Sequence, residues 1–218
     1  MVWSTIARNT SYYNYISQGT GAAVPGNAIA NLNTTGLTIL STVTGVDDGF
    51  GIIPISFPFY FFGVDYGSNL NKIFWSTNNV LHFNIGTNTI TWVATTGLGI
   101  LLGNTDRRTN TFYYSTTQSS SGYNYINCVL YAQNIYNDGI PNAIQWQIRI
   151  FRGSSNQYIE VRSATVPNTG GVWNITNGSV FQNTFGGYTN VTSGNSFVLQ
   201  SDINGNNWQF LNNYYVNI

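Results

Sequence analysis

Residues 144–162 read IQWQIRIFRGSSNQYIEVR, and this stretch decides the fold class. Apolar and polar residues alternate on both sides of the GSSN segment, which is the pattern of two strands joined by a turn. Pairing residue 152 with residue 157 places Ile148 opposite Val161 on one face of the pair. Because a single register suits the whole stretch, the sequence predicts an antiparallel hairpin with this pairing.

Arg149 and Glu160 face each other on the other side of this hairpin. A cross-strand pair of opposite charge contributes roughly 0.2–1 kcal/mol to a sheet. The same two residue types could also be a catalytic acid and the group that orients it. Since one register accounts for both residues, we interpret them as a structural hairpin pair.

The rest of the chain shows the same short β-branched and aromatic runs, separated by Asn, Gly, Ser and Pro, and no sustained helical periodicity. Ten or more short strands at this spacing predict an all-β protein, built as an antiparallel β-sandwich or a jelly-roll-like domain. Asn204 and Gly205 predict a two-residue hairpin turn. Further strands are expected at Leu37–Val43, Ile52–Phe62, Lys72–Trp75, Val80–Ile85, Thr89–Ala94, Thr111–Thr116, Tyr123–Ala132, Ser196–Ile203 and Trp208–Val216.

The predicted strands belong to one β-sandwich domain over residues 36–218. Residues 1–35 are less periodic and rich in Asn, Gly and Ala, which suggests an N-terminal arm or irregular segment. Such a segment docks either on its own domain or on neighbouring chains, and the sequence leaves both alternatives open.

Charge is scarce throughout the chain. Charged residues make up 6% of the 218 residues, against roughly 25% in an ordinary soluble domain. Seven basic and seven acidic residues cancel, so no net field draws the chain to nucleic acid or to an anionic membrane. The chain has 31 Asn and 25 Thr, and 42% apolar residues supply a core. Uncharged amides avoid the desolvation penalty of buried charges, which suits a chain surrounded by other chains.

The N-terminus lacks the basic start and apolar run of a signal peptide, and no apolar stretch approaches the roughly 20 residues of a membrane helix. Cys128 is the single cysteine, so no intramolecular disulfide can form. We therefore expect synthesis in a reducing cytoplasm without membrane insertion.

Residues 46–66 read VDDGFGIIPISFPFYFFGVDY, and residues 72–84 read KIFWSTNNVLHFN. The acidic pair with Gly, the F-P-F-x-F-F-G-x-x-Y run and the S-T-N turn resemble a nidogen-like β-sandwich module of secreted and particle-surface proteins. Asn79 replaces the usual Gly of this family, and Asn is the best non-Gly residue at positive φ. The resemblance implies a sandwich and a surface-exposed setting, without a catalytic role. Its turn and core residues in this chain are Asp47, Asp48, Gly49, Phe57, Phe59, Phe61, Gly63, Asn78 and Asn79.

A second resemblance is compositional. The stretches GVWNITNGSVFQNTFG (residues 171–186) and WQFLNNYYVNI (residues 208–218) look like structural proteins of large DNA viruses, such as minor capsid, vertex or appendage proteins. Those proteins are also rich in Asn, Thr and Tyr and are made without signal peptides. The resemblance implies a surface-type domain that assembles inside cells.

Candidate catalytic and metal-binding residues are few. His82 is the single histidine, and one His with one Cys excludes the usual zinc ligand sets. Asp47 and Asp48 could be a carboxylate pair for glycoside hydrolysis or a calcium site. Adjacent strand residues point to opposite faces, and Gly49 favours a turn that the Asp side chains cap. We therefore interpret the pair as turn residues.

Two further charged segments also have structural interpretations. Asp202 begins a DINGNN sequence that is similar to a calcium loop, but the loop lacks Gly at its sixth position and the closing Glu. Asp106, Arg107 and Arg108 form a cluster, which we interpret as a local or interface salt bridge because no basic patch surrounds it. The sequence therefore predicts no catalytic site, no cofactor site and no metal site.

The sequence thus predicts a non-enzymatic structural protein of a virus particle, namely a minor capsid, vertex or surface component. Its partners would be other copies of itself and other virion proteins, with assembly in the host cytoplasm and final location in the virion. The alternative is a carbohydrate-binding fibre head or lectin-like module that recognises a host glycan through exposed aromatic side chains. Both hypotheses exclude nucleic acid and membrane insertion.

Overall fold

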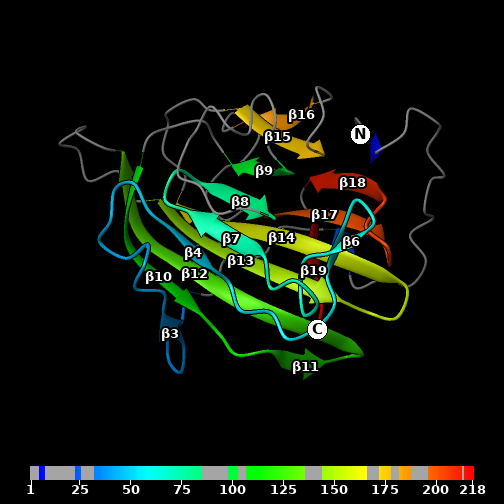
Figure 1. The fold of residues 1–218 in the computed structure, drawn as a ribbon, viewed down its shortest axis with the longest axis horizontal. Coiled ribbons are helices and arrows are strands. Elements are labelled where there is room, and N and C mark those ends of the chain that lie inside the picture. Colours follow the sequence, from blue (N-terminus) through cyan, green and yellow to red (C-terminus); the bar gives the residue numbers. More distant parts are fainter. Residues whose placement is uncertain are drawn as a thin grey trace.

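The computed structural model describes residues 5–7, 23–25, 32–84, 98–102, 107–135, 144–165, 172–177, 182–187, 196–212 and 214–218. These residues form β-strands, turns and extended segments, with no helix among them. Two large antiparallel sheets pack face to face, so the all-β prediction is confirmed and the architecture is a β-sandwich (Figure 1).

The larger sheet has nine strands. Its strands are β1 (Thr5–Ala7), β3 (Thr38–Ile39), β10 (Arg107–Tyr114), β11 (Gln118–Ser120), β12 (Tyr123–Ile135), β13 (Ile144–Arg152), β14 (Asn156–Thr165), β17 (Ser196–Asp202) and β18 (Asn207–Asn212). They run in the order β1-β18-β17-β14-β13-β12-β10-β3, and β11 pairs with one end of β12.

The smaller sheet has six strands and lies above the first in Figure 1. Its strands are β4 (Phe50–Ile52), β7 (Ile73–Ser76), β8 (Val80–Phe83), β9 (Leu98–Leu102), β15 (Val172–Asn177) and β16 (Gln182–Gly187). They run in the order β16-β15-β9-β8-β7-β4.

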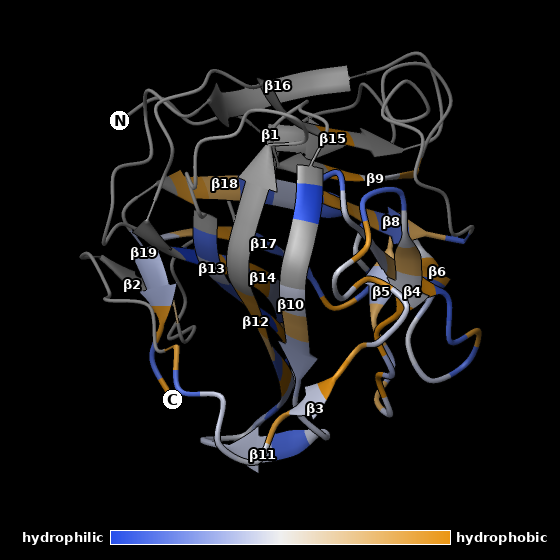
Figure 2. Cartoon of the chain, turned by 90° about the vertical axis from the view of Figure 1, so that its left-hand side faces the viewer, coloured by the Kyte–Doolittle hydropathy of each residue, from blue (hydrophilic) through white to orange (hydrophobic). Residues whose placement is uncertain are grey.

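Two short strand pairs complete the described structure. One pair is β5 (Tyr60–Phe61) with β6 (Val64–Asp65), and the other is β2 (Ala23–Pro25) with β19 (Tyr214–Val216). Figure 2 shows β2 and β19 on the side of the nine-stranded sheet that faces away from β4 and β8. The nine-stranded sheet is therefore covered on both faces along β13, β14 and β17.

The predicted hairpin is β13 and β14, and its register is confirmed. Ile148 pairs with Val161 and Arg149 pairs with Glu160. Ile148 and Val161 lie in the core between the two large sheets. The alternation of side chains along each strand therefore turns Arg149 and Glu160 towards the outer face, on which β19 lies.

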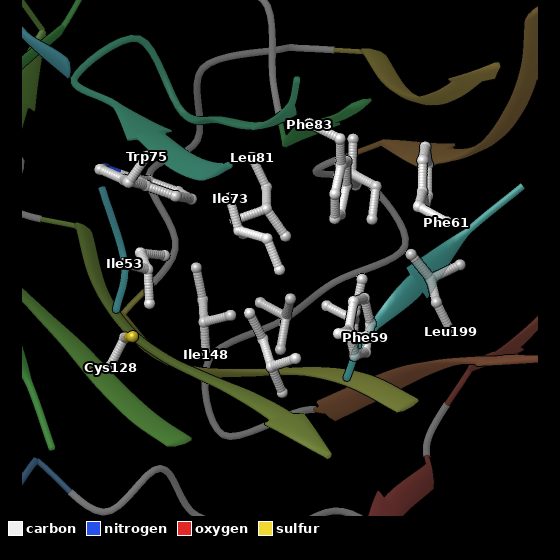
Figure 3. Close-up of a cluster of buried hydrophobic side chains, with 14 of the residues drawn as sticks. Ile53, Phe59, Phe61, Ile73, Trp75, Leu81, Phe83, Cys128, Ile148 and Leu199 are labelled. Atoms are coloured by element: carbon white, nitrogen blue, oxygen red, sulfur yellow. The ribbon is translucent and has the colours of Figure 1, made fainter. Parts of the chain in front are cut away.

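Aromatic rings and aliphatic side chains together fill the space between the sheets (Figure 3). Phe61 stacks on Phe83 of the six-stranded sheet, with 3.9 Å between the ring centroids. Trp208 of the nine-stranded sheet tilts against Phe61 at 5.4 Å. Phe61 thus joins the two sheets, although it belongs to neither.

A continuous strand over Ile52–Phe62, as predicted, is wrong, although the predicted alternation of side chains is present. Only its two ends lie in strands, β4 and β5. Between them the chain is extended and its side chains alternate between the core and solvent. The prolines at positions 54 and 58 lack the N–H that a ladder requires, so the pairing with β7 ends at the hydrogen bond from the Ile53 N–H to the Ile73 carbonyl.

The prediction for Trp208–Val216 is also wrong, because two strands replace one. β18 belongs to the nine-stranded sheet, whereas β19 leaves that sheet and pairs with β2. The strand predicted at Leu37–Val43 is also shorter than expected, because β3 covers only Thr38–Ile39. Residues 40–44 form a turn, in which the Leu40 carbonyl accepts hydrogen bonds from the N–H groups of Val43 and Thr44.

The turn between β17 and β18 is longer than the predicted two-residue turn. The last ladder pair is Ser201 with Trp208, which leaves six residues between them. The Asp202 carboxylate accepts the N–H groups of Asn204 and Asn206 at 3.0 and 3.1 Å, so it holds a wider loop. Gly205 has a φ of 66°, whereas Asn204 is not at positive φ.

The N-terminal segment contributes two of the described strands. β1 pairs with β18 and β2 pairs with β19, so both strands dock on their own chain. The boundary at residue 35 stays a prediction. The predicted strand Thr89–Ala94 lies outside the described residues.

Candidate functional site

Arg149 and Glu160 form a bidentate ion pair on the outer face of the nine-stranded sheet. Arg149 Nε donates to Glu160 Oε1 at 2.8 Å, and Arg149 Nη2 donates to Glu160 Oε2 at 2.7 Å. Glu160 is 0% exposed and Arg149 is 8% exposed. The predicted cross-strand pairing is confirmed, and the structure adds that the pair is buried, where charge-assisted hydrogen bonds act in a lower dielectric than at the surface.

The strand β19 covers this ion pair. The Glu160 carboxylate accepts the N–H of Val216, and Arg149 Nη2 donates to the Val216 carbonyl at 2.9 Å. Ser196 Oγ donates to the carbonyl of Tyr214. Three polar side chains of the nine-stranded sheet thus hold the main chain of β19.

A polar network extends from the ion pair across three neighbouring strands. Arg162 Nε lies 3.6 Å from Glu160 Oε1, and Arg162 Nη1 donates to Gln147 at 2.8 Å. Gln147 in turn donates to Asn127 at 2.8 Å. Burial lowers the pKa of the Arg162 guanidinium, and the Glu160 carboxylate raises it. Arg162 therefore stays charged at neutral pH, because no such shift approaches neutrality.

Aromatic and aliphatic side chains surround the polar network on the side of β19. This outer cluster consists of Phe151, Tyr158, Val198, Leu211, Tyr214 and Val216, with Ala23, Tyr123, Tyr125 and Ile218 partly buried against it. The Arg149 guanidinium lies over the Phe151 ring, 4.8 Å from its centroid. The ion pair is therefore enclosed by apolar groups and by the β19 main chain.

The residues of the predicted module turns lie together. The N–H of Gly49 donates to Thr77 Oγ1 at 3.1 Å, and the N–H of Thr77 donates to the Gly49 carbonyl at 2.9 Å. Asp47 is partly buried beside this contact, and Asp48 is exposed. Asp47 and Asp48 therefore directly precede Gly49, whose backbone is hydrogen-bonded to Thr77 of the next turn.

Asn78 and Asn79 lie in that next turn, and both are buried. Asn79 has a φ of 61°, and its N–H donates to the Ser76 carbonyl at 3.1 Å. The expectation that Asn79 occupies a positive-φ position is confirmed. Gly63 also has positive φ, at 80°.

Phe57, Phe59 and Phe61 all lie in the core, as the alternation predicts. Asp65 fixes the loop that follows, because its Oδ1 accepts the N–H groups of Phe59 and Gly67, both at 2.9 Å. The module residues therefore act in packing and turn geometry.

The tip of the β17–β18 hairpin joins the module to the nine-stranded sheet. The Gly205 carbonyl accepts the N–H of Phe62 at 2.7 Å and Trp208 Nε1 at 3.0 Å. Gln157 accepts the Tyr60 N–H at 3.0 Å and donates to its carbonyl. A Cβ at Gly205 would overlap the Tyr60 carbonyl, so only glycine permits this close approach.

The described residues offer little for metal or acid–base chemistry. They contain no group of three or more His, Cys, Asp or Glu side chains that could hold a metal ion. His82 lies fully buried in β8. Burial strongly raises the pKa of the Cys128 thiol, which makes it a poor nucleophile at neutral pH. Nor do the described residues include a helix that is long and apolar enough to cross a membrane.

Asp202 is engaged with its own loop rather than being arranged for calcium. Besides the two N–H groups, its Oδ2 accepts Asn207 Nδ2 at 2.7 Å. Arg108 is exposed in β10, and the cluster partner at position 106 lies outside the described residues. The proposed salt bridge of that cluster stays a prediction.

Large apolar side chains are exposed at a few described positions. Phe50 and Ile52 in β4 are 44% and 41% exposed, Ile39 in β3 is 50% exposed and Leu70 is 39% exposed. Phe50 and the half-buried Phe74 meet edge to face, with 6.3 Å between their centroids. Because β4 ends the six-stranded sheet, Phe50, Ile52 and Phe74 form an apolar patch at a sheet edge. We call it the β4 patch.

Sequence reasoning missed the residues that act through the main chain. Val216 was predicted as a strand residue, but its role as the partner of Arg149 and Glu160 had no signal because it depends on a contact over 56 residues. Asp65 was also missed, although an Asp two residues before a Gly is a weak signal for a turn that the carboxylate caps.

Three comparisons with known proteins found nothing similar: no family model matches the chain, and neither a curated protein nor a solved structure does. The resemblances to a nidogen-like module and to viral structural proteins therefore stay predictions.

Proposed function

We propose that the chain is a non-enzymatic structural subunit of a virus particle, and that it works by associating with copies of itself and with other virion proteins. The observation that carries the proposal is the β4 patch. Edge strands of soluble proteins are usually protected by charges, prolines or bulges. β4 is short and lies between Asp48 and Pro54, yet two of its three residues expose large apolar side chains at the sheet edge.

The scarcity of charge supports the same proposal. With 6% charged residues and a formal net charge of zero, copies of the chain do not repel one another over distance. A free monomer with no net charge is prone to self-association, whereas a subunit in an assembly tolerates it.

The glycan-binding alternative has less support. It requires exposed, coplanar aromatic side chains, and Trp75, Trp146 and Trp208 are all buried in the core between the sheets. Among the side chains that the structure describes, Phe50 is the most exposed aromatic one. It lies beside aliphatic Ile52 rather than beside polar groups.

The test is the solution mass of the untagged chain, measured by size-exclusion chromatography with light scattering over a range of concentrations. We expect a defined oligomer or a mass that rises with concentration. Phe50→Ser with Ile52→Thr should weaken association about tenfold or more. Leu70→Ser is the matched control, because it removes a similarly exposed side chain outside the sheet edge.

A monomer at every concentration would contradict association through like copies. Equal effects of the β4 variant and the Leu70→Ser control would contradict the role of the β4 patch. Antibodies raised against the chain should label purified particles from infected cells, and particles that lack the chain would contradict the virion assignment.

A further inference from the structure

The strand β4 presents main-chain hydrogen-bonding groups at the edge of the six-stranded sheet. In the described part of the chain, no strand of this sheet lies beyond β4. The Ile53 N–H donates to the Ile73 carbonyl at 2.8 Å, so residue 53 faces β7. Successive residues in an antiparallel ladder direct their N–H and C=O groups alternately towards the paired strand and away from it. The N–H and C=O groups of Phe50 and Ile52 therefore point away from β7, towards the open edge.

Two exposed charged residues lie at opposite ends of this edge. Asp48 comes just before β4, and Lys72 comes just before the antiparallel strand β7, where the register places it beside Pro54. Six steps of extended chain separate position 48 from position 54, or about 20 Å at roughly 3.3 Å per residue. Asp48 and Lys72 of one copy are thus too far apart to pair, and neither belongs to an ion pair of the described residues.

A second copy of the chain offers matching main-chain groups. When two β4 strands run antiparallel with Gly51 opposite Gly51, the outward groups of Phe50 in each copy face those of Ile52 in the other. Every outward group at this edge of β4 then has a hydrogen-bond partner. The two glycines fall at a non-hydrogen-bonded position, where the Cα atoms approach to about 4.5 Å. The exposed Phe50 and Ile52 side chains become cross-strand neighbours, next to Phe74.

The same register brings unlike charges together. Asp48 of one copy lies opposite Pro54 of the other, and Lys72 of that second copy is the next residue in the row. Two strand spacings, or about 10 Å, separate the Cα atoms of Asp48 and Lys72, a distance that the two side chains bridge together. A parallel arrangement would instead place the two Asp48 carboxylates beside each other, which is unfavourable. The charges of the edge therefore match a second copy in the antiparallel direction.

We infer that β4 of one copy pairs antiparallel with β4 of a second copy about a twofold axis at Gly51, which joins two six-stranded sheets into one. This inference rests on the proposed function, because it specifies how the β4 patch binds. The contact is isologous, since both copies contribute the same residues. Main-chain hydrogen bonds provide affinity in such strand addition, and the side chains of Asp48, Phe50, Ile52 and Lys72 provide specificity.

Charge reversal at the two ends of the edge tests the register. Asp48→Lys gives a chain with a positive group at each end, and Lys72→Asp gives a chain with a negative group at each end. Each variant alone should self-associate about tenfold more weakly than the wild type, because like charges then meet. An equimolar mixture should form a one-to-one complex with the affinity of the wild type. The difference should shrink at about 1 M salt, where the Debye length is about 3 Å.

Arg108→Asp is the matched control for Lys72→Asp. It makes the same change of charge at an exposed position of β10, in the other sheet. Its mixture with the Asp48→Lys chain should therefore show no gain in affinity. Size-exclusion chromatography with light scattering gives the mass of each mixture, and fluorescence anisotropy of a labelled chain gives its affinity.

Disulfide trapping tests the same register without charge. An Asp48→Cys chain and a Pro54→Cys chain, both with Cys128→Ala, place their thiols directly opposite each other in the antiparallel pair. The Cα separation at such positions is about 5.5 Å, within the range that a disulfide spans. The mixture should crosslink under mild oxidation. The Asp48→Cys chain alone should not, because its two cysteines would be about 20 Å apart.

Folded variants that neither regain affinity in the charge-reversed mixture nor crosslink would overturn the inference. If a charge-reversed chain fails to fold by near-ultraviolet circular dichroism, the crosslinking result decides. A wild-type oligomer that depends on the β4 patch but shows neither effect would contradict the antiparallel pairing and leave the proposed function in place. Restored affinity and crosslinking, together with particles that lack the chain, would contradict the proposed function and leave the pairing in place.

Discussion

Along β13 and β14 both faces of the nine-stranded sheet carry buried side chains, but the two faces are built from different chemistry. On the inner face, Ile148 and Val161 meet the apolar core. On the outer face, their neighbours Arg149 and Glu160 form an ion pair beneath β19. Alternation in a sequence therefore predicts which way a side chain faces, whereas burial depends on what covers that face.

The two faces also hold the fold together by different means. Apolar contacts on the inner face are non-directional and scale with the area removed from water. The outer ion pair is directional, and each partner is stable in the interior only while the other is present. A substitution on the inner face should therefore lose packing, and a substitution on the outer face should lose pairing.

The largest effect is expected from the inner face. Phe61→Ala removes the ring that stacks on Phe83 and contacts Trp208, and a buried Phe truncated to Ala typically costs 3–5 kcal/mol. We expect a loss of about 4 kcal/mol in the free energy of unfolding, measured by urea denaturation. Phe50→Ala is the control, with an expected loss under about 0.5 kcal/mol because that ring is exposed.

The second prediction compares a substitution of one partner of the ion pair with a substitution of both. Arg149→Met leaves the buried Glu160 carboxylate with the Val216 N–H and the more distant Arg162, and should cost about 3 kcal/mol. The double variant, with Glu160→Leu added, removes both charges and should recover only part of that loss, because the Val216 N–H and carbonyl still lose their partners. A double-mutant cycle in urea measures the coupling. Additive losses would mean that the two residues do not act as a pair.

The third prediction concerns the tip of the β17–β18 hairpin, which contacts Tyr60 and Phe62. Gly205→Ala and Gly122→Ala both place a side chain at positive φ, at 66° and 81°, which costs about 1–2 kcal/mol. Gly122 has open space around its Cβ position, whereas at Gly205 the Cβ overlaps the Tyr60 carbonyl. Gly205→Ala should therefore lose about 2 kcal/mol more than Gly122→Ala. Equal melting temperatures for the two variants would contradict the close approach.

The smallest effect depends on pH. Burial raises the pKa of the Cys128 thiol from its ordinary value of 9.0. Above that pH the unfolded chain releases the thiol proton and the folded chain keeps it, so stability is lost as the pH rises. Between pH 8 and pH 10 the wild type should lose about 1.4 kcal/mol more than Cys128→Ala. The comparison is made by urea denaturation under reducing conditions, and parallel pH profiles would show that the thiol is accessible to water.

Much of the fold was predictable because local patterns carry it. The register of β13 with β14 follows from alternation on both faces of one hairpin. The burial of Phe57, Phe59 and Phe61 follows from the same period of two. The positive φ of Asn79 follows from the backbone tolerance of Asn.

The wrong predictions near the C-terminal strands involve contacts with distant segments. The apolar run at Trp208–Val216 predicts one strand, yet β18 and β19 find partners in different sheets. The Asn204–Gly205 turn is widened by Asp202, and its tip is fixed by Tyr60 across the interface. The Asp202 contacts are local, whereas the contact with Tyr60 leaves no mark on the local sequence.

The sequence by itself determined an all-β chain, the central hairpin and the placement of Arg149 opposite Glu160, because side-chain period and charge pairing act between near neighbours. Only the tertiary structure decided that this ion pair is buried and that it holds the main chain of β19. That outcome depends on a strand 56 residues further along the chain. Contacts of this kind arise from packing of the whole molecule, and the local pattern does not contain them.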